Sequence, residues 1–561
     1  MTAESQSESI VDPGPSHDTA RELALAHGLS ATAADLLARR GHLPGADTAR
    51  WLDPKLAELS HPGPMVDREL AADRIARAIR ARERVAVFGD YDCDGITSTA
   101  ILCTVIEALG GEAVPVLASR MAGGYGLSAP ALERVVATGA TLLITCDCGS
   151  SDHERVAEAM RRGIDTIVID HHLVPAEPLP ALAFLNPHRP DCGFAFKGLA
   201  SCGLAFSIAA ALRQRLGKEL DLRPWLDLVA IGTVADVAPL GGDNRALVRA
   251  GLKVLSGGLR PGVRALAELA KLELSRGVTS EDIGFRIAPR LNAPGRLGDP
   301  DAALALLVAR DAQTAAGLAA SIEQVQLRRR AMQASIVDEA QAMLLSEPLR
   351  SAPGLVLAKE GWHPGIVGIV AGKIAEATRK PTIVVGLEGA EGRGSVRGPR
   401  GFPLHDALTR CADALLGFGG HQAAAGVHLR ADRVTELQAQ WSAACEALRG
   451  GERGAAADAH VRLDPGDDPR RVLEDLERFE PFGEGNPTPL FLLDEVEVRS
   501  ARDLKGHLKL DLRHAGRELS GIQFGEGARA TELRGTTRRL VASLRRDHYR
   551  GGVELHVTRL A

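Results

Sequence analysis

The 561-residue sequence contains no long hydrophobic run and few aromatic residues, which make up only 3% of the chain. A membrane-spanning helix needs roughly 18 or more consecutive apolar residues, so the sequence predicts no membrane span. Residues 1–18 are polar and acidic and lack the apolar core of an export signal. We therefore expect a cytoplasmic protein that does not associate with membranes.

The sequence also lacks paired cysteines. It has eight cysteines, and no two of them form a C-x-x-C pair. This spacing indicates neither a zinc site nor a disulfide framework. Most of the cysteines lie in apolar segments, where we expect buried thiols.

Charge is distributed unevenly along the chain. The formal net charge is −5, but residues 499–561 contain 14 Lys and Arg against 7 Asp and Glu. This basic C-terminal end fits a polyanionic partner, although a solvated basic surface would give the same count.

One stretch concentrates negative charge. From Val85 to Ser98 the sequence reads V-A-V-F-G-D-Y-D-C-D-G-I-T-S, in which an apolar strand pattern ends in Asp90, Asp92 and Asp94 and a helical pattern follows. Three neighbouring carboxylates repel one another at neutral pH, so a divalent cation is the natural counter-charge. The alternative, an acidic turn that caps the helix, needs only one of them.

Helical and strand patterns alternate from residue 68 onward, which predicts an α/β fold with a mainly parallel sheet. The expected strands are 85–90, 113–118, 142–147, 166–170 and 228–235. Functional sites in such folds lie at the carboxyl ends of the strands. Four of these strands end in acidic residues or histidines, namely Asp90, Asp147, Asp170 with His171 and His172, and Asp236. Any one of them could be a helix cap, but together they favour two Mn²⁺ or Mg²⁺ ions.

Four motifs mark these strand ends: G-D-Y-D-C-D-G at 89–95, D-C-G at 147–149, D-H-H at 170–172 and G-T-V-A-D at 232–236. The set resembles the DHH phosphoesterase superfamily. The first motif, with R-L-N-A-P-G-R at 290–296, is similar to the RecJ single-stranded-DNA exonucleases in particular.

The resemblance implies a role for each motif residue. The implied metal ligands are Asp92, Asp94, Asp147, His171 and Asp236, with Asp90 in the cluster or beside it. His172 would lie at the scissile phosphate as a transition-state stabiliser or proton donor. The implied catalytic set is His172, Asp147 and His171.

The segment 286–296 is rich in arginine, proline and glycine. We interpret it as a rigid loop that presents Arg290 and Arg296 to phosphate oxygens, with Asn292 also in the substrate site. The alternative is that these arginines pair with acidic surface groups.

Two further units follow the predicted catalytic domain of residues 67–310. A long helical pattern over 311–346 predicts a rigid connector to a second α/β lobe at 350–450. The glycine-rich elements of this lobe fit neither a P-loop nor a Rossmann fingerprint. They resemble the DHHA1 substrate-binding domain, in which Ser395, Arg397, Gly420 and His421 would contact a phosphodiester.

The C-terminal region 458–561 alternates with period two in five short segments, which is typical of an OB-fold barrel. The expected strands are 490–498, 508–512, 519–524, 540–544 and 553–560. After Phe491 only Phe524 and Tyr549 are available for base stacking, so we expect a mostly electrostatic grip on nucleic acid. At the other end of the chain, residues 1–17 read as a disordered tail and 18–66 as a helical leader.

These features predict a metal-dependent exonuclease that hydrolyses single-stranded DNA to mononucleotides. The resemblance alone implies 5′ to 3′ direction, a role in DNA repair and recombination, and single-stranded-DNA-binding protein and helicases as partners. Alternatives are a short-oligonucleotide or cyclic-dinucleotide phosphodiesterase, a soluble pyrophosphatase, and a catalytically inactive nucleic-acid-binding scaffold.

Overall fold

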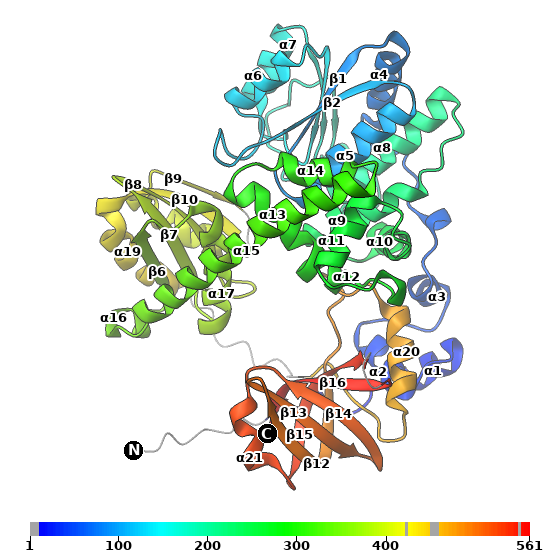
Figure 1. The fold of residues 1–561 in the computed structure, drawn as a ribbon, viewed down its shortest axis with the longest axis vertical. Coiled ribbons are helices and arrows are strands. Elements are labelled where there is room, and N and C mark those ends of the chain that lie inside the picture. Colours follow the sequence, from blue (N-terminus) through cyan, green and yellow to red (C-terminus); the bar gives the residue numbers. More distant parts are fainter. Residues whose placement is uncertain (1–9, 421–423, 449–458, 548–550) are drawn as a thin grey trace.

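A computed structural model describes residues 10–420, 424–448, 459–547 and 551–561. Three sheet-containing units are arranged around helices, as Figure 1 shows: an α/β domain, which we call the catalytic domain after the role expected from its sequence, a second α/β lobe and a C-terminal β-barrel. No helix of the described residues is long and apolar enough to cross a membrane.

The catalytic domain is built on a five-stranded parallel sheet of order β2-β1-β3-β4-β5. The chain steps outward from β1 to β2 and then crosses back to β3, so the strand order reverses between β1 and β3. Ligands of open α/β sheets bind at such a reversal, outside the carboxyl ends of the strands. The strands are β1 (Arg84–Gly89), β2 (Glu112–Leu117), β3 (Leu142–Cys146), β4 (Asp165–Ile169) and β5 (Ala183–Leu185).

Helices cover both faces of this sheet, which explains why its strands read as continuous apolar runs. One face packs on α4 (Arg68–Ala81), α5 (Cys93–Ala108) and α8 (Ser201–Leu216), and the other on α6 (Ala129–Ala137), with α7 (His153–Arg161) beside it.

The expected strand 228–235 is wrong. The structure has a helix there, α9 (Leu226–Ala235), whose residues 226–233 are all buried. Periodicity cannot separate a buried strand from a buried helix in a short, continuous apolar run. Asp236 therefore follows a helix, and the sheet contributes three strand ends to the site.

The rest of the catalytic domain is helical. It comprises α10 (Gly242–Ser256), α11 (Pro261–Leu269), α12 (Ser280–Asp282), the π-helix η4 (Ile283–Ile287), α13 (Ala288–Leu297) and α14 (Asp301–Val308). The loop expected at 286–296 is therefore also wrong, because these residues form the end of η4 and most of α13.

One 32-residue helix, α15 (Ala312–Met343), joins the catalytic domain to the second lobe. It begins at Asp311, whose side chain accepts a hydrogen bond from the Thr314 amide. At 1.5 Å per residue it is about 48 Å long. It packs on α13 at one end and on α17 of the second lobe at the other, so it fixes the spacing of the two units.

The second lobe has a mixed sheet of order β6-β7-β8-β10-β9. Its strands are β6 (Leu355–Glu360), β7 (Thr382–Glu388), β8 (Glu391–Arg397), β9 (Gly417–Gly420) and β10 (Ala424–Arg430). One face packs on α17 (Pro364–Thr378) and the end of α15, and the other on α18 (Leu404–Thr409) and α19 (Val434–Ala447).

The C-terminal unit is a closed barrel. Its strands are β12 (Phe491–Leu504), β13 (His507–His514), β14 (Arg517–Gln523), β15 (Thr537–Arg546) and β16 (Val553–Leu560). They pair in the order β12-β13-β14-β16-β15, and β15 returns to β12. Only the β14–β16 pair within this closed barrel is parallel. This agrees with the expected OB-fold.

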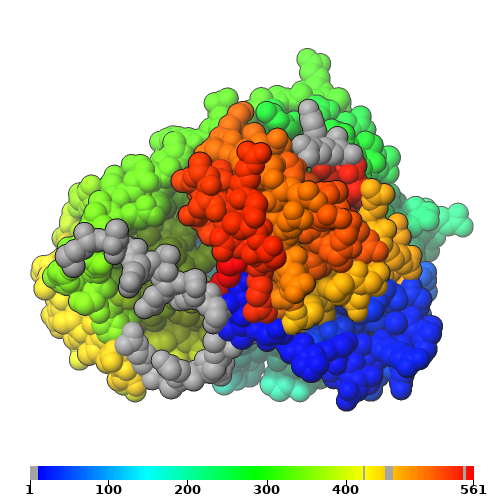
Figure 2. Space-filling model, turned by 90° about the horizontal axis from the view of Figure 1, so that it is seen from below, coloured from blue at the N-terminus to red at the C-terminus, as the bar shows by residue number. Residues whose placement is uncertain are grey.

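The N-terminal helices pack on the barrel rather than on the catalytic sheet. Leu23 of α1 (Ala20–His27) and Leu36 of α2 (Ala31–Arg39) share one core with Phe491 of the barrel and Phe479 of α20 (Pro469–Phe479). Seen from below in Figure 2, the blue N-terminal helices form one surface with α20 and the barrel. Leader and barrel are therefore one structural unit.

Residues 10–17 differ from the disordered tail expected at 1–17. Ile10 is buried against Leu492, and Asp12 forms ion pairs with Arg462 and Arg539. Residues 1–9 lie outside the described part of the chain.

Candidate metal centre and nucleic-acid interface

Two aspartates open the site at the sheet reversal. Asp90 follows β1, and Asp92 caps α5 by accepting hydrogen bonds from the amides of Asp94 (3.0 Å) and Gly95 (3.2 Å). A side chain at Gly95 would lie 2.5 Å from the Asp90 backbone, so the strand end and the helix start touch here only because this residue is glycine. This close turn brings Asp90, Asp92 and Asp94 together.

Asp94 is fully buried at the N-terminus of α8. Its carboxylate accepts hydrogen bonds from the amides of Ser201 (2.7 Å) and Cys202 (2.9 Å). The partial positive charge of a helix N-terminus stabilises a carboxylate in this position.

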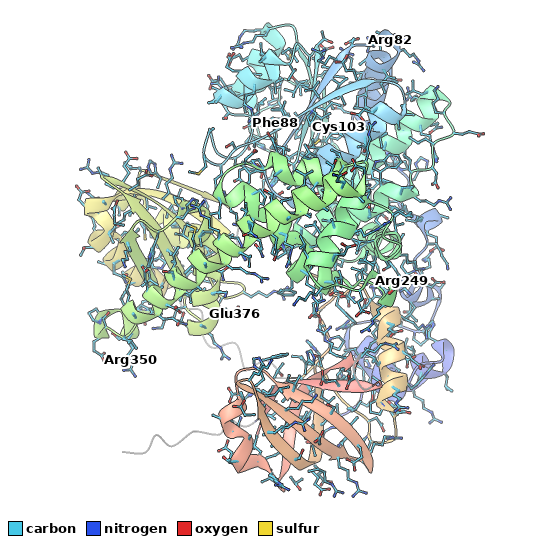
Figure 3. All side chains as sticks on the ribbon, in the orientation of Figure 1. Arg82, Phe88, Cys103, Arg249, Arg350 and Glu376 are labelled. Atoms are coloured by element: carbon cyan, nitrogen blue, oxygen red, sulfur yellow. The ribbon has the colours of Figure 1, made fainter. Side chains whose placement is uncertain are left out.

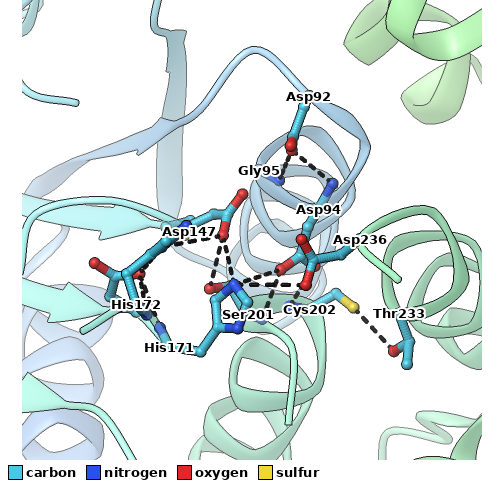
Figure 4. Close-up of polar contacts among 12 residues, drawn as sticks. Asp92, Asp94, Gly95, Asp147, His171, His172, Ser201, Cys202, Thr233 and Asp236 are labelled. Atoms are coloured by element: carbon cyan, nitrogen blue, oxygen red, sulfur yellow. Dashed lines mark hydrogen bonds and ion pairs between the residues drawn. The ribbon is translucent and has the colours of Figure 1, made fainter. Parts of the chain in front are cut away.

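His171 joins carboxylates from three elements. Its Nε2 lies 3.1 Å from Asp147 Oδ1, 3.6 Å from Asp236 Oδ2 and 4.0 Å from Asp94 Oδ2 (Figure 4). Burial lowers the pKa of His171 and so favours the neutral imidazole, the form that binds metals. The ligand atoms form three groups, each within 4.8 Å. Two of them hold the six expected ligands, and we call them the two ligand groups: Asp94, His171 and Asp236, and Asp90, Asp92 and Asp147. The third, Asp147 with His171 and His172, links these two.

The carboxylates of this cluster lack sufficient counter-charge. Burial raises the pKa of Asp147, and the neighbouring Asp94 and Asp92 raise it further. Burial and the same two carboxylates raise the pKa of Asp236 to about 8. Asp90 Oδ1 is buried and has no hydrogen-bond partner among the described residues. Two divalent cations would neutralise these charges and engage the Asp90 oxygen, so the donor set fits Mn²⁺ or Mg²⁺.

His172 has a different environment. Its Nδ1 lies 2.7 Å from Asp170 Oδ1, and Asp170 also accepts hydrogen bonds from the backbone amides of Ser150, His171 and His172. Burial lowers the pKa of His172, but the bond to Asp170 outweighs this and raises it to about 9. Asp170 is therefore a hydrogen-bond partner of His172 and favours its protonated form.

Tyr125, in a glycine-rich loop after β2, was not predicted as a site residue. Its hydroxyl lies 3.1 Å from His172 Nδ1 and donates to the carbonyl of Asp147 at 3.2 Å. The signal in the sequence was the group of three glycines around this tyrosine, which marks a tight loop. In the structure Gly123, Gly124 and Gly126 all have positive φ angles.

Three residues of segment 290–296 were expected in the substrate site, and the structure gives each of them different contacts. Arg290 is only 6% exposed and is bonded to Glu323 of α15 at 2.6 and 3.2 Å, so it does not face a substrate. Asn292 Oδ1 accepts from the Cys93 amide and so supports the aspartate turn. Arg296 lies near Asp92, where burial lowers its pKa to about 10.

Arg120, also missed from the sequence, lies close to Arg296. Its guanidinium is 4.4 Å from the centre of the Tyr91 ring, and its charge lowers the pKa of Arg296. Its Nε is buried and has no hydrogen-bond partner among the described residues. Two arginines beside the aspartate cluster provide an anion site.

The second lobe reaches this site through the first turn of α17. Arg296 Nη1 donates to the Gly365 carbonyl at 3.3 Å, and a Cβ at Gly365 would lie 2.1 Å from the Arg296 carbonyl. One turn along α17, Gly368 faces the Ser395 and Arg397 side chains of β8, which bond each other at 2.9 Å. Gly420 ends β9 with φ of 146°. His421 lies outside the described residues.

The barrel carries a group of three rings. Phe524 is 58% exposed, and its ring centre lies 5.3 Å from that of His507 and 5.5 Å from that of His556. The two histidines were not predicted, and Tyr549 lies outside the described residues. The barrel therefore offers more stacking surface than the sequence indicated.

Comparisons with known proteins agree with this architecture. The sequence matches the DHH family, N-terminal domain, over residues 84–233, the DHHA1 domain over 351–447 and the RecJ OB domain over 460–558. The single-stranded-DNA-specific exonuclease RecJ of Haemophilus influenzae is 32% identical over 558 residues, which cover 93% of this chain and 94% of that protein. The chain belongs to the RecJ family.

Other RecJ proteins show the same relationship. RecJ of Bacillus subtilis is 34% identical over 520 residues, and the aligned part covers 91% of this chain but only 65% of that relative. The crystal structure of Thermus thermophilus RecJ with Mn²⁺ has a TM-score of 0.82 at 32% identity and covers 98% of this chain and 78% of that one. Its Mg²⁺ complex gives 0.76 at 30% identity and covers 97% and 77%.

Membership of the RecJ family confirms the resemblance inferred from the four motifs, the α/β fold and the OB-fold barrel. It also agrees with a site for Mn²⁺ or Mg²⁺, since both ions occur in the related structures and the two ligand groups fit them.

Proposed function

We propose that this chain is a metal-dependent exonuclease that hydrolyses single-stranded DNA from one end and releases mononucleotides. The observation that carries the proposal is the pair of ligand groups at the sheet reversal, with His172 beside them and bonded to Asp170 at 2.7 Å. Relatives named as single-stranded-DNA-specific exonucleases support the substrate. The 5′ to 3′ direction rests on family membership alone.

The six metal ligands would be Asp90, Asp92, Asp94, Asp147, His171 and Asp236. Metal ions bound there would supply an activated water and neutralise negative charge on the phosphate. Asp147 lies between the two ligand groups, since its Oδ1 is 3.1 Å from His171 and it also groups with Asp90 and Asp92. Its removal should therefore disturb both.

His172 would act on the scissile phosphodiester. Asp170 holds a proton on Nδ1 and so favours the charged imidazolium, which would donate to a phosphate oxygen. A protonated imidazole stabilises negative charge that develops on the phosphate or the leaving oxygen. Tyr125 lies against the same ring, 5.5 Å between centres, and limits its rotation.

Basic and polar side chains would hold the strand. Arg296 and Arg120 are placed for a phosphate at the metal centre, and Ser395 and Arg397 for one beside the second lobe. The barrel would hold the strand farther from its end. The proposal includes two kinds of partner, single-stranded-DNA-binding protein and helicases, because both act on single-stranded DNA. It also includes a cytoplasmic location, where this substrate would be met.

The test is digestion of end-labelled single-stranded oligonucleotides in Mn²⁺ or Mg²⁺, with polarity and product size read from the label. We expect Asp147→Ala to lose at least a thousandfold in rate while still binding DNA, and Mn²⁺ to raise the melting temperature of the wild type more than that of the variant. Asp191→Ala, which removes a surface carboxylate, is the control and should behave as wild type.

Three results would contradict the proposal. Retained nuclease activity in Asp147→Ala would remove the metal assignment. Faster turnover of dinucleotides than of long strands would indicate the short-oligonucleotide alternative. Absence of metal-dependent nucleotide release from any substrate would indicate an inactive binding scaffold.

A further inference from the structure

One segment connects the barrel to the aspartate cluster. At its start, Ser280 Oγ donates to the Phe482 carbonyl at 2.6 Å and Glu281 forms an ion pair with Arg545 of β15. At its end, Asn292 bonds the Cys93 amide at 2.9 Å. In Figure 1, α12 and α13 at the two ends of this segment lie on the side of the catalytic domain nearest to the second lobe and the barrel. The π-helix η4 lies between these two contacts.

Phe285 stands out in η4. Its side chain is 74% exposed, more than any other phenylalanine, tyrosine or tryptophan in the described chain. Its neighbours Ile283 and Ile287 are fully buried, so the π-helix is anchored on both sides while Phe285 points away from the core. π-Helical turns are rare and frequently lie at functional sites.

The burial pattern places Phe285 on a defined face. Phe285, Pro289, Asn292 and Arg296 are spaced by four, three and four residues, and all four are more exposed than the core residues between them. Residues with this spacing lie on one side of a helix. Along about 16 Å of helix, this face runs from Phe285 to the arginine beside Asp92.

Arg286 adds charge to the exposed ring. Its side chain is about half exposed and lies 3.5 Å from Asp282, a contact that leaves its remaining donors open to a phosphate. An exposed aromatic ring next to an arginine is the combination with which proteins hold unpaired nucleotides, because a base stacks on the ring while its phosphate pairs with the cation.

We propose that Phe285 is a stacking site for an unpaired base, between the barrel and the metal centre. The proposal rests on the proposed function, because it needs a strand whose end lies at the aspartate cluster. The face from Phe285 to Arg296 then carries the strand over its last few nucleotides. A duplex, whose bases are already stacked on one another, offers no face to this ring.

Photochemical cross-linking tests the contact directly. 5-Iododeoxyuridine is placed at successive positions from the end of an oligonucleotide and irradiated with the full-length protein in Ca²⁺, a cation chosen to permit binding without turnover. We expect a cross-link at Phe285 from one internal position, a few nucleotides from the end, and its loss in Phe285→Ala. Absence of a cross-link at Phe285 from every position overturns the proposal.

Kinetics test the contribution of the ring to binding. We expect Phe285→Ala to raise KM for a 20-nucleotide strand about tenfold with little change in kcat, and Phe285→Trp to keep KM within about twofold of wild type. The control is Leu345→Ala, which removes an equally exposed apolar side chain beyond the end of α15. An unchanged KM in Phe285→Ala overturns the stacking site, whereas a wild type that degrades no single strand contradicts the proposed function itself.

Discussion

Arg290 of α13, which is buried, and Glu323 of α15, which is partly buried, form an ion pair with two hydrogen bonds, of 2.6 and 3.2 Å. Arg290 also donates to the Arg286 carbonyl at 2.6 Å, so its guanidinium is committed to protein partners. The pair ties the catalytic domain to the long helix that carries the second lobe. Its role is therefore to hold two units in place, and the substrate contact expected of Arg290 is not available in this structure.

Loss of one partner of this pair should destabilise the protein. We expect Arg290→Met to lower the free energy of unfolding by about 2 kcal/mol, because the partly buried Glu323 loses its counter-charge and two hydrogen bonds. The double variant Arg290→Met with Glu323→Leu should recover most of this loss. Urea unfolding of the two variants measures the difference, and KM for single-stranded DNA should stay near wild type in the double variant. A large rise in KM there would restore Arg290 as a phosphate ligand.

Glu480 predicts a pH dependence of stability. Burial raises the pKa of Glu480 to about 7, and the nearby Glu477 acts in the same direction, while Arg545 opposes it. In the unfolded chain this carboxyl titrates near 4.5, so between these two values the folded state keeps a proton that the unfolded state releases. The contribution to stability is therefore full below about pH 4.5 and is lost as the pH rises to 7, by up to about 3 kcal/mol.

The measurement is the urea midpoint of wild type and Glu480→Gln at pH 5.5 and 8.5. The glutamine does not ionise, so we expect the variant to gain stability relative to wild type at the higher pH. Glu474→Gln, on the exposed side of α20, the helix that ends just before Glu480, is the control and should show no such gain. Equal pH dependence in wild type and Glu480→Gln would contradict the raised pKa. The residue lies where Arg249 of α10 bonds the end of α20 (Figure 3), so the effect reports on the junction between the catalytic domain and the barrel unit.

Phe524 predicts how the barrel binds a strand. We expect Phe524→Ala to raise KM for long single strands about tenfold, since a stacked base contributes roughly 1–3 kcal/mol. The slope of log KM against log salt concentration should not change, because the phosphate contacts remain. Leu504→Ala, an exposed apolar residue of the same barrel, is the control. A reduced salt slope in Phe524→Ala would show that the ring acts through phosphate contacts instead.

This point substitution is a cleaner test than removal of the barrel. Deletion of residues 458–561 would expose Leu23 and Leu36 of the N-terminal helices, which share the barrel core. A loss of DNA binding in such a deletion would then mix the loss of basic contacts with the unfolding of the leader.

The clustering of the acidic residues and His171 could largely be predicted from the sequence, because each motif is a short local segment. Asp90, Asp92 and Asp94 fall within five residues, and Asp147 and His171 each follow an apolar strand pattern. In parallel sheets all such strand ends meet at one edge, so the pattern alone predicts their proximity. Asp236 was harder to place, because the apolar run before it fits a buried strand as well as a buried helix. It lies in the cluster as predicted, but it follows the helix α9 and not a strand.

The sequence by itself predicted the α/β fold, the barrel and the clustering of acidic residues and histidines at one edge of the sheet, because strand and helix periodicity and clustered charge are properties of neighbouring residues. Tertiary structure alone decided what the isolated polar and aromatic side chains do. Arg290 turns inward because Glu323, 33 residues away, lies opposite it, and Tyr125 reaches His172 across 47 residues. Phe285 faces outward because the core takes Ile283 and Ile287 instead. Contacts of this kind depend on which elements pack together, and this packing cannot be predicted from a local sequence pattern.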